Sequence, residues 1–224
     1  MQNPMESMLE QGLEELGLSL DQEQQLKLLR YVKQMQRWNK TYNLTAITKP
    51  QDMLVQHILD SLAVVPYLKK LLANKQKAVT LVDVGTGAGL PGVVLAIVNA
   101  QWELLCIDSV EKKTAFIQQM RGVLELPNLN VAHSRVQDLD PLGCDVLISR
   151  AFSSLENIIK WCGNHVAPGG YIVAMKGQLP TEELEQLSGQ SGWEVERLIS
   201  IDVPFLDAER CLVLLKNKVA HEYP

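Results

Sequence analysis

The chain of 224 residues is long enough for one well-cored domain with a modest additional segment. Its 46% hydrophobic and 21% charged residues exclude a disordered or fibrous protein. No apolar run approaches the roughly 20 residues that span a bilayer, and the polar, acidic start is unlike a secretory signal. The net charge of −5 gives no whole-protein attraction to nucleic acid, so any RNA binding requires a local basic patch.

The four cysteines form no C-x-x-C pair, and each lies within or beside an apolar segment: Cys106, Cys144, Cys162 and Cys211. This spacing indicates buried free thiols in a reducing cytoplasm and no metal site. We therefore expect a cytoplasmic protein without a membrane association.

Residues 1–72 are predicted to be helical. Apolar positions at helical spacing mark a first helix that Gly17 ends, and Ser19 or Asp21 can cap a second. Basic residues recur along the second helix every three or four positions, which places them on one broad face: Lys27, Arg30, Lys33, Arg37 and Lys40. This face is either ordinary solvated surface or a surface that contacts RNA phosphates.

A stretch rich in polar and aromatic residues follows and predicts an ordered loop up to Thr48. Pro50 then starts another helix, on which His57 and Asp60 are three residues apart and could pair. A lone histidine on a helix is more often structural than catalytic, so the structural interpretation of His57 is the default.

From residue 79 the pattern changes to alternating strands and helices. We place the boundary near residues 72–78, between a helical segment (1–72) packed on the core and an α/β core (73–224). Strands are predicted at 81–84, 102–107, 129–132, 144–149, 171–175, 193–201 and 210–215. Helices are predicted at 90–98, 111–124, 155–165 and 181–187, with a turn at 167–170. Continuous apolar strands are typical of a parallel sheet that is buried on both faces.

The glycine-rich turn after the first strand is the main functional signal. The pattern Gly87-x-Gly89-x-x-Gly92 matches the dinucleotide fingerprint, and Asp108 lies about twenty residues further on. An NAD-binding domain is therefore a competing hypothesis. Asp83 argues against it because a carboxylate would repel a diphosphate, and Pro91 removes one N–H donor from the start of the helix.

S-adenosylmethionine (SAM) suits this turn better, because it carries an ammonium group and no phosphate. In this interpretation Asp83 attracts the ammonium group, and Asp108 accepts hydrogen bonds from the ribose hydroxyls. Three glycines would allow the methionine part to approach the backbone: Gly85, Gly87 and Gly89.

The loops after the next strands are expected to complete the site, because ligands of such sheets bind at the carboxyl ends of the strands. Val136 and Gln137 follow the third strand and could contact adenine. Arg150 follows the fourth strand and could hold the cofactor carboxylate or a substrate phosphate. Lys176 ends the fifth strand in the same way.

The residues predict no dedicated acid, base or nucleophile. The loop at 149–152 lacks the Asn/Asp-Pro-Pro-Tyr/Phe pattern that is frequent in enzymes methylating exocyclic amines. Cys144 begins a strand and is expected to be buried, so it is not a candidate nucleophile. An aromatic ring nitrogen such as guanine N7 requires neither base nor nucleophile, only proximity and alignment.

Several segments together resemble one known family. They are Trp38-Asn39-Lys40-x-Tyr42-Asn43-Leu44-Thr45, His57-Ile58-Leu59-Asp60-Ser61, Val82 to Gly92, Ser134-Arg135-Val136, Ser149-Arg150-Ala151-Phe152 and Lys176-Gly177. Over nearly its whole length the chain resembles the RsmG (GidB) family of bacterial small-subunit ribosomal RNA guanine-N7 methyltransferases. The two segments ahead of the glycine turn are the most specific part of this resemblance.

The resemblance implies a class I, Rossmann-like SAM-dependent methyltransferase fold: a mostly parallel sheet with an antiparallel C-terminal strand, preceded by the helical segment. It implies methylation of one guanine N7 in the decoding region of 16S rRNA, with 16S rRNA or the small ribosomal subunit as partner. We expect the protein to be a monomer. By motif match it places SAM contacts at Gly85, Leu90, Val136, Gln137 and Arg150.

The resemblance also favours RNA binding by a set of basic residues: Arg30, Lys33, Arg37, Lys40 and Arg135. Arg150 and Lys176 are candidates for positioning the substrate. Gln137 stands where the family usually has an acid, and Cys211 stands where a histidine is common. Two alternatives remain: a SAM-dependent enzyme acting on a small molecule, and a SAM-binding rRNA factor without catalysis.

Overall fold

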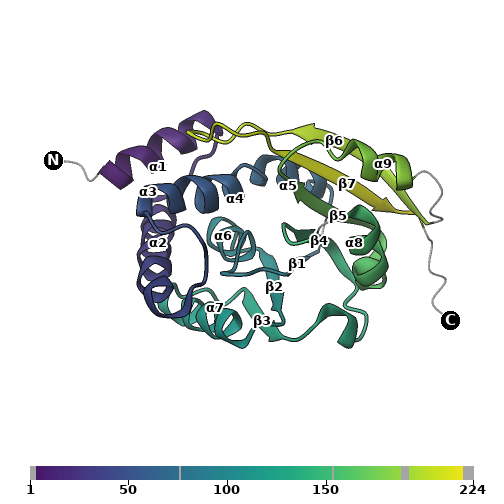
Figure 1. The fold of residues 1–224 in the computed structure, drawn as a ribbon, viewed down its shortest axis with the longest axis horizontal. Coiled ribbons are helices and arrows are strands. Elements are labelled where there is room, and N and C mark those ends of the chain that lie inside the picture. The colour runs from purple at the N-terminus through teal and green to yellow at the C-terminus, as the bar shows by residue number, and fades with distance from the viewer. Residues whose placement is uncertain (1–3, 76, 153, 188–191, 219–224) are drawn as a thin grey trace.

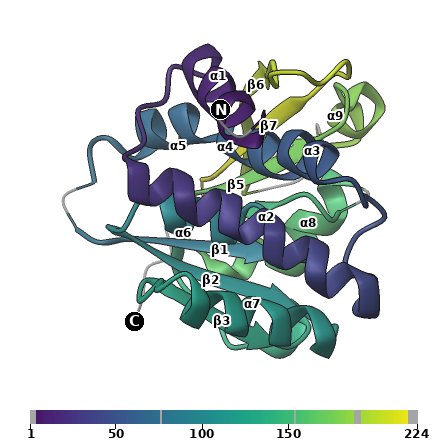
Figure 2. The same ribbon diagram turned by 90° about the vertical axis from the view of Figure 1, so that its left-hand side faces the viewer.

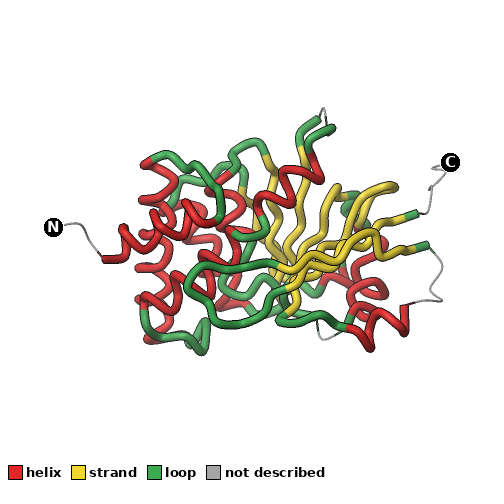
Figure 3. Tube along the Cα trace, turned by 90° about the horizontal axis from the view of Figure 1, so that it is seen from above, coloured by secondary structure: helices red, strands yellow, loops and turns green. Residues whose placement is uncertain are grey.

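The computed structural model describes residues 4–75, 77–152, 154–187 and 192–218. A central sheet of seven strands has helices on both faces (Figure 3). The strands are β1 (Val79–Val84), β2 (Trp102–Asp108), β3 (Leu129–His133), β4 (Cys144–Ser149), β5 (Val166–Lys176), β6 (Trp193–Ser200) and β7 (Cys211–Asn217). Their order is β3-β2-β1-β4-β5-β7-β6, and β7 runs antiparallel to both of its neighbours. The predicted mostly parallel sheet with an antiparallel C-terminal strand is confirmed.

The helices of the N-terminal part are α1 (Pro4–Glu15), α2 (Gln22–Tyr42), α3 (Pro50–Met53), the π-helix η1 (Leu54–Leu59), α4 (Asp60–Leu62) and α5 (Val65–Leu72). Those of the remaining chain are α6 (Gly92–Val98), α7 (Glu111–Val123), the 3₁₀-helix η2 (Val136–Asp138), α8 (Leu155–Cys162), the 3₁₀-helix η3 (Gly163–His165) and α9 (Thr181–Leu187). None of the described helices has the length and apolar character needed to cross a membrane.

The two faces of the sheet carry two separate hydrophobic clusters, because successive strand residues point to opposite sides. Leu81 and Leu104 belong to the cluster that also contains α6, α7 and the N-terminal helices, whereas Val82 and Leu147 pack with α8 and α9. Figure 2 shows α2 crossing in front of α6 and α7, as an outer layer over the first face. The described N-terminal helices thus share a core with the sheet, and a division of the chain at residue 72 stays a prediction.

The N-terminal helices lie together on one side of the molecule (purple and blue in Figure 1). Asp21 caps α2 with a reciprocal capping box to Gln24, one of the two caps that the sequence offers. The helix that starts at Pro50 contains a π-helical turn, which the sequence pattern does not indicate. Such turns are rare and often occur at functional sites.

One local expectation is wrong. Residues 167–170 are not a separate turn, since β5 extends through them from Val166. The pairing of β4 with β5 is irregular between Cys144 and Val146, and Gly169 has a φ of +70°. The Pro-Gly-Gly sequence therefore makes an irregularity within the strand, as glycine and proline in strands often do.

Candidate functional site: two cavities at one edge of the sheet

At Gly85 and Gly89 the glycine turn after β1 packs too closely against its surroundings to accept side chains. Gly85 has a φ of +69°, and a Cβ there would lie 2.5 Å from the Cβ of Ala151, in the loop after β4. Gly89 has a φ of +92°, and a Cβ there would lie 2.4 Å from Cγ2 of Val93. Both glycines are therefore required by conformation and by close packing.

The N–H groups of this turn are largely engaged within the protein. Gly85 donates to the carbonyl of Ile107 (2.9 Å), Gly87 donates to Oδ2 of Asp108 (2.9 Å), and Gly92 donates to Asp83. A dinucleotide site directs such N–H groups toward the diphosphate. The geometry therefore argues against the NAD hypothesis.

Asp83 organises the turn from inside the fold. Its side chain is fully buried, and its Oδ2 accepts hydrogen bonds from the Thr86 hydroxyl (2.5 Å) and the Gly92 N–H (2.8 Å). Burial raises the pKa of Asp83 to about 6, although these two hydrogen bonds act in the opposite direction. The carboxyl group of Asp83 is enclosed by the turn and the start of α6. This geometry argues against the expected direct contact between Asp83 and the ammonium group of a ligand.

A cavity of about 440 Å³ lies between the ends of β1, β2 and β3. We call it the glycine-turn cavity, and it is lined by Val84, Gly85, Ile107, Asp108, Ser109, Ser134, Arg135, Val136, Gln137, Phe152 and Trp161. Of the predicted cofactor residues, Gly85, Asp108, Val136 and Gln137 line it. The remaining ones lie outside its lining: Asp83, Gly87, Gly89, Leu90 and Arg150. Arg135, predicted to bind RNA, lies in this lining instead.

Asp108 places a carboxylate in the wall of this cavity. Its Oδ1 accepts from the Val110 N–H and its Oδ2 from the Gly87 N–H, both at 2.9 Å, while Lys113 Nζ lies 3.7 Å away. Each carboxylate oxygen has a second lone pair, so the group can still accept hydrogen bonds from the hydroxyls of a ribose. This carboxylate acceptor fits the hydroxyls of a nucleoside better than a phosphate, which a carboxylate would repel.

An aromatic pair completes the cavity. The rings of Phe152 and Trp161 lie 5.8 Å apart at 56° to each other, and Trp161 is 39% exposed. The sequence analysis assigned neither residue to the cofactor site, although Phe152 belongs to one of the segments that carry the family resemblance. A signal was available, since Trp161 falls outside the buried stripe of α8 formed by Leu155, Ile158 and Cys162.

A second cavity of about 360 Å³ lies across the β4 loop from the first. Its lining is Ile47, Gln56, His57, Asp60, Arg150, Met175, Lys176, Gly177 and Arg210. We call it the arginine cavity. Consecutive parts of one loop line both cavities, because Arg150 faces the arginine cavity and Phe152 the glycine-turn cavity. The structure thus brings together Arg150 and Lys176, as expected, and adds Arg210, which the sequence analysis missed.

Asp60 holds the two arginines. Its nearly buried carboxylate pairs through Oδ2 with Nη1 of Arg150 and through Oδ1 with Nε of Arg210, each at 2.7 Å. Lys176 in turn pairs with Glu183 at 2.9 Å. Arg150 is thus held on Asp60, away from the residues that line the glycine-turn cavity.

His57 does not pair with Asp60, as the sequence suggested it could. Its Nδ1 lies 3.1 Å from the carbonyl of Gln56, which can only accept, so we assign the proton to Nδ1 and Nε2 accepts from the Thr45 hydroxyl (2.9 Å). Burial, assisted by the charge of Arg150, lowers the pKa of His57 to about 4. The ring is neutral near pH 7 and ties the loop before α3 to η1, which agrees with a structural role.

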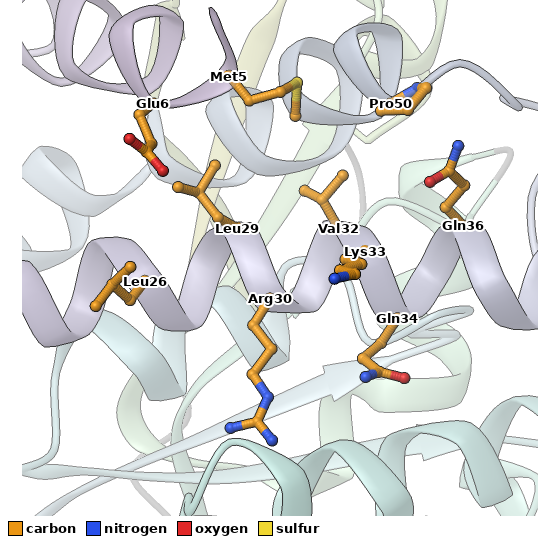
Figure 4. Close-up of a pocket in the computed structure, with 10 residues that line it drawn as sticks. All are labelled: Met5, Glu6, Leu26, Leu29, Arg30, Val32, Lys33, Gln34, Gln36 and Pro50. Atoms are coloured by element: carbon orange, nitrogen blue, oxygen red, sulfur yellow. The ribbon is translucent and has the colours of Figure 1, made fainter. Parts of the chain in front are cut away.

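None of the basic residues of α2 lines the glycine-turn cavity or the arginine cavity. Figure 4 shows Leu29 and Val32 pointing toward α1, whereas Arg30 points away from it. The side chain of Gln24 donates to the carbonyls of Ile97 and Val98 at the C-terminal end of α6 (3.2 Å each). The N-terminal end of α2 therefore lies away from the glycine turn, which precedes the other end of α6. Lys40, at the other end, lines a cavity of about 550 Å³ formed with residues 43–48.

Tyr31 connects α2 to the glycine turn. Its buried hydroxyl donates to the carbonyl of Ala88, and its ring stacks on Phe116 of α7 with 6.1 Å between the centroids. Helix α2 therefore packs against the glycine turn and stabilises it, although none of the residues of α2 lines the glycine-turn cavity.

The cysteines offer no nucleophile to either cavity. All four are buried free thiols, and burial raises the pKa of Cys144 and of Cys162 to about 12. A thiol with such a pKa remains protonated near neutral pH.

Comparison with known proteins shows the family. The family model described as "GidB: rRNA small subunit methyltransferase G" matches residues 24–213. The chain belongs to this family. A relative named ribosomal RNA small subunit methyltransferase G from Bordetella avium (strain 197N) is 56% identical over 209 residues, which cover 93% of this chain and 92% of the relative. A relative of the same name from Burkholderia vietnamiensis (strain G4) is 45% identical over 214 residues, covering 93% and 91%.

Solved structures with low sequence identity share the fold. The magnesium protoporphyrin IX methyltransferase from Synechocystis PCC 6803, solved with bound SAM, superposes with a TM-score of 0.59 at 17% identity, covering 89% of this chain and 98% of that one. A SAM-dependent methyltransferase from Aquifex aeolicus gives 0.54 at 20% identity, covering 75% and 93%. These likenesses confirm the fold of SAM-dependent methyltransferases that the sequence predicted.

Proposed function

We propose that this protein uses SAM to methylate the N7 position of a guanine in the decoding region of 16S rRNA. The family match over residues 24–213 carries this proposal. The glycine-turn cavity supports it, because its carboxylate, close-packed turn and aromatic pair suit a phosphate-free nucleoside. We further propose that the protein acts as a monomer in the cytoplasm, on 16S rRNA or on the small ribosomal subunit.

In this proposal Gly85, Asp108, Val136 and Gln137 hold the cofactor in the glycine-turn cavity. When bound, SAM supplies an electrophilic methyl group on a sulfonium. Guanine N7 carries a lone pair and no proton, so the chain needs no general base to activate it. The neutral, engaged His57 agrees with this requirement. The chain contributes by holding the base in line with the methyl group, an effect of proximity and orientation.

Transfer of labelled methyl from SAM to small subunits lacking the modification tests the proposal. We expect incorporation into 16S rRNA, with chain cleavage specific for N7-methylguanine mapping it to one nucleotide. Subunits that already carry the methyl group are the matched control and should accept no label. Absence of transfer to rRNA, or a methyl group on a different atom, would contradict the proposal. If the protein binds SAM but transfers no methyl group to rRNA, a non-catalytic factor or an enzyme that acts on a small molecule is favoured.

A further inference from the structure

The arginine cavity is built by segments that are far apart in the chain. Asp60 comes from the helix after Pro50, Arg150 from the loop after β4, and Arg210 from the residue before β7. Each arginine meets one oxygen of the same carboxylate at 2.7 Å. Two guanidinium groups are thereby fixed on one carboxylate in the lining of one cavity.

The charges around Asp60 do not cancel. Two guanidinium groups on one carboxylate leave a net charge of about +1, and the Arg150 and Arg210 side chains stay 26% and 25% exposed. Arg150 uses Nη1 on Asp60 and the Gln56 carbonyl, and Arg210 uses Nε on Asp60 and Nη1 on the Glu209 carbonyl. Since a guanidinium has five N–H donors, donors remain on both arginines for an anion.

The family-specific segments ahead of the glycine turn converge on this cavity. The Asn39 amide clasps the following loop, donating to the Ile47 carbonyl (3.2 Å) and accepting from the Thr45 N–H (2.9 Å). Thr45 then bonds His57, and both Ile47 and His57 line the arginine cavity. None of these residues lines the glycine-turn cavity. Their role in the site therefore lies in the arginine cavity.

The size and place of the cavity select the ligand. Its volume of about 360 Å³ lies at the lower end of the range for small-ligand sites, roughly 300–1,000 Å³. The loop after β4 contributes Arg150 to this cavity and Phe152 to the glycine-turn cavity, so a ligand in it would lie beside the cofactor. Since the family is one of rRNA methyltransferases, the anionic ligand that has to lie next to the methyl donor is a nucleotide of the RNA substrate.

We propose that the arginine cavity is the subsite for the target nucleotide, in which Arg150 and Arg210 bind its phosphate and Asp60 is the positioning residue that holds them. This inference rests on the proposed function, because it assumes an RNA substrate. It extends that function by assigning the contact to the phosphate of the modified nucleotide itself, as distinct from the general attraction of a basic surface.

Arg210→Gln is the direct test, with Arg197→Gln as its matched control. Arg197 is an exposed arginine of β6, the edge strand, and its removal costs the same unit of charge. For Arg210→Gln we expect the KM for small subunits lacking the modification to rise about tenfold or more, since charged hydrogen bonds are lost. The negative slope of log(kcat/KM) against log[salt] should become less steep by about 0.7–0.9, because one phosphate contact is lost. SAM affinity should stay within about twofold for both variants, because neither residue lines the glycine-turn cavity.

Asp60→Asn separates positioning from simple charge. Removing a carboxylate makes the cavity more positive, so on charge alone the KM for RNA should fall. If Asp60 holds the arginines in place, the KM should rise in spite of the added positive charge. A lowered KM for a folded Asp60→Asn protein would overturn the positioning role, and an Arg210→Gln protein with the KM and salt slope of Arg197→Gln would overturn the subsite.

Binding of free guanosine 5′-monophosphate, compared with guanosine, separates this inference from the proposed function. Saturation-transfer NMR on the protein loaded with S-adenosylhomocysteine should show tighter binding of the monophosphate, and Arg210→Gln should remove the difference. If the wild type discriminates in this way but methylates no rRNA, the proposed function fails and the phosphate site stands. If it methylates rRNA but does not discriminate, the subsite fails and the function stands.

Discussion

Two buried carboxylates, Asp83 beside the glycine-turn cavity and Asp60 in the arginine cavity, have opposite kinds of partner. Asp83, under the glycine turn, accepts hydrogen bonds from a hydroxyl and a backbone N–H, both neutral donors. Asp60, under the arginine cavity, meets two guanidinium groups. Neutral donors stabilise the ionised form less than cations do, which agrees with the raised pKa of Asp83.

This difference indicates which interactions each cavity depends on. The glycine-turn cavity depends on the main-chain geometry of the turn after β1, which packs against the loop after β4, so a backbone change in the turn should destroy it. The arginine cavity depends on side-chain charges from distant segments, so loss of one charge should weaken RNA binding and leave the cofactor in place. The predictions below test this separation.

Gly85→Ala should have the largest effect. Its Cβ would lie 2.5 Å from the Ala151 Cβ, at a φ of +69°. Strain and overpacking of a few kcal/mol together predict a roughly 100-fold loss of SAM affinity in calorimetry. Because Ala151 adjoins Arg150, we also expect a raised KM for RNA.

Gly87→Ala is the matched control for that change. Gly87 has a similar φ of +61°, but a Cβ there would meet no atom within 4 Å. The Gly87→Ala variant should therefore have the backbone strain without the steric contact, and its loss of SAM affinity should be about tenfold or less. Equal losses in the two variants would show that the contact with the β4 loop is unimportant.

Asp83→Asn should change how the free energy of unfolding depends on pH, because it removes a buried carboxyl group with a raised pKa. A folded-state pKa of about 6, above the unfolded value near 3.9, means that the folded protein favours the protonated acid. This contribution is fully present below about pH 4 and is lost as the pH rises through 6. Relative to Asp83→Asn, the wild type should therefore lose on the order of 3 kcal/mol of unfolding free energy between pH 4 and 7.

Urea denaturation across that pH range makes the measurement. Asp202→Asn, at an exposed aspartate, is the control and should differ from wild type by a nearly constant amount. A pH-independent difference for Asp83→Asn as well would mean that Asp83 titrates normally in the folded protein.

Asp108→Asn should show the reverse of the Arg210→Gln pattern. The asparagine keeps one acceptor, but its NH₂ group faces one of the two backbone N–H donors from Gly87 and Val110. We expect SAM affinity to fall by about 10- to 100-fold, as for a lost charged hydrogen bond. The KM for RNA, measured at saturating SAM, should change by less than about twofold. A comparable rise in the Kd for SAM and in the KM for RNA would show that the cavities are one coupled site.

The sequence predicts the glycine-turn cavity better than the arginine cavity for a physical reason. Strand, turn and helix are contiguous, so Gly85, Asp108 and Val136 could be assigned from position along the chain. Arg210 meets Asp60 across 150 residues, and no local pattern encodes that pairing. The direction of a side chain is equally non-local, and for that reason the enclosed position of Asp83 was missed.

The elements themselves were predicted well where periodicity was strong. The strands from β1 to β4 lie within two residues of their expected bounds, because buried parallel strands give continuous apolar runs. The π-helical turn at Leu54–Leu59 and the continuation of β5 through the Pro-Gly-Gly sequence depend on tertiary packing, which overrides local preference.

The smallest effect should distinguish the two ends of α2. Lys40 lies near the C-terminal end of α2 and lines the cavity formed with residues 43–48. Lys27 lies in the first turns of the same helix and is paired with Glu23 (2.7 Å). Lys40→Gln should raise the KM for small subunits about two- to threefold at low salt, because one phosphate contact is lost. Lys27→Gln, the matched control on the same helix, should leave the KM unchanged. Equal effects of the two variants would mean that α2 attracts RNA along its whole length, and the separate arginine cavity would then carry less of the substrate specificity.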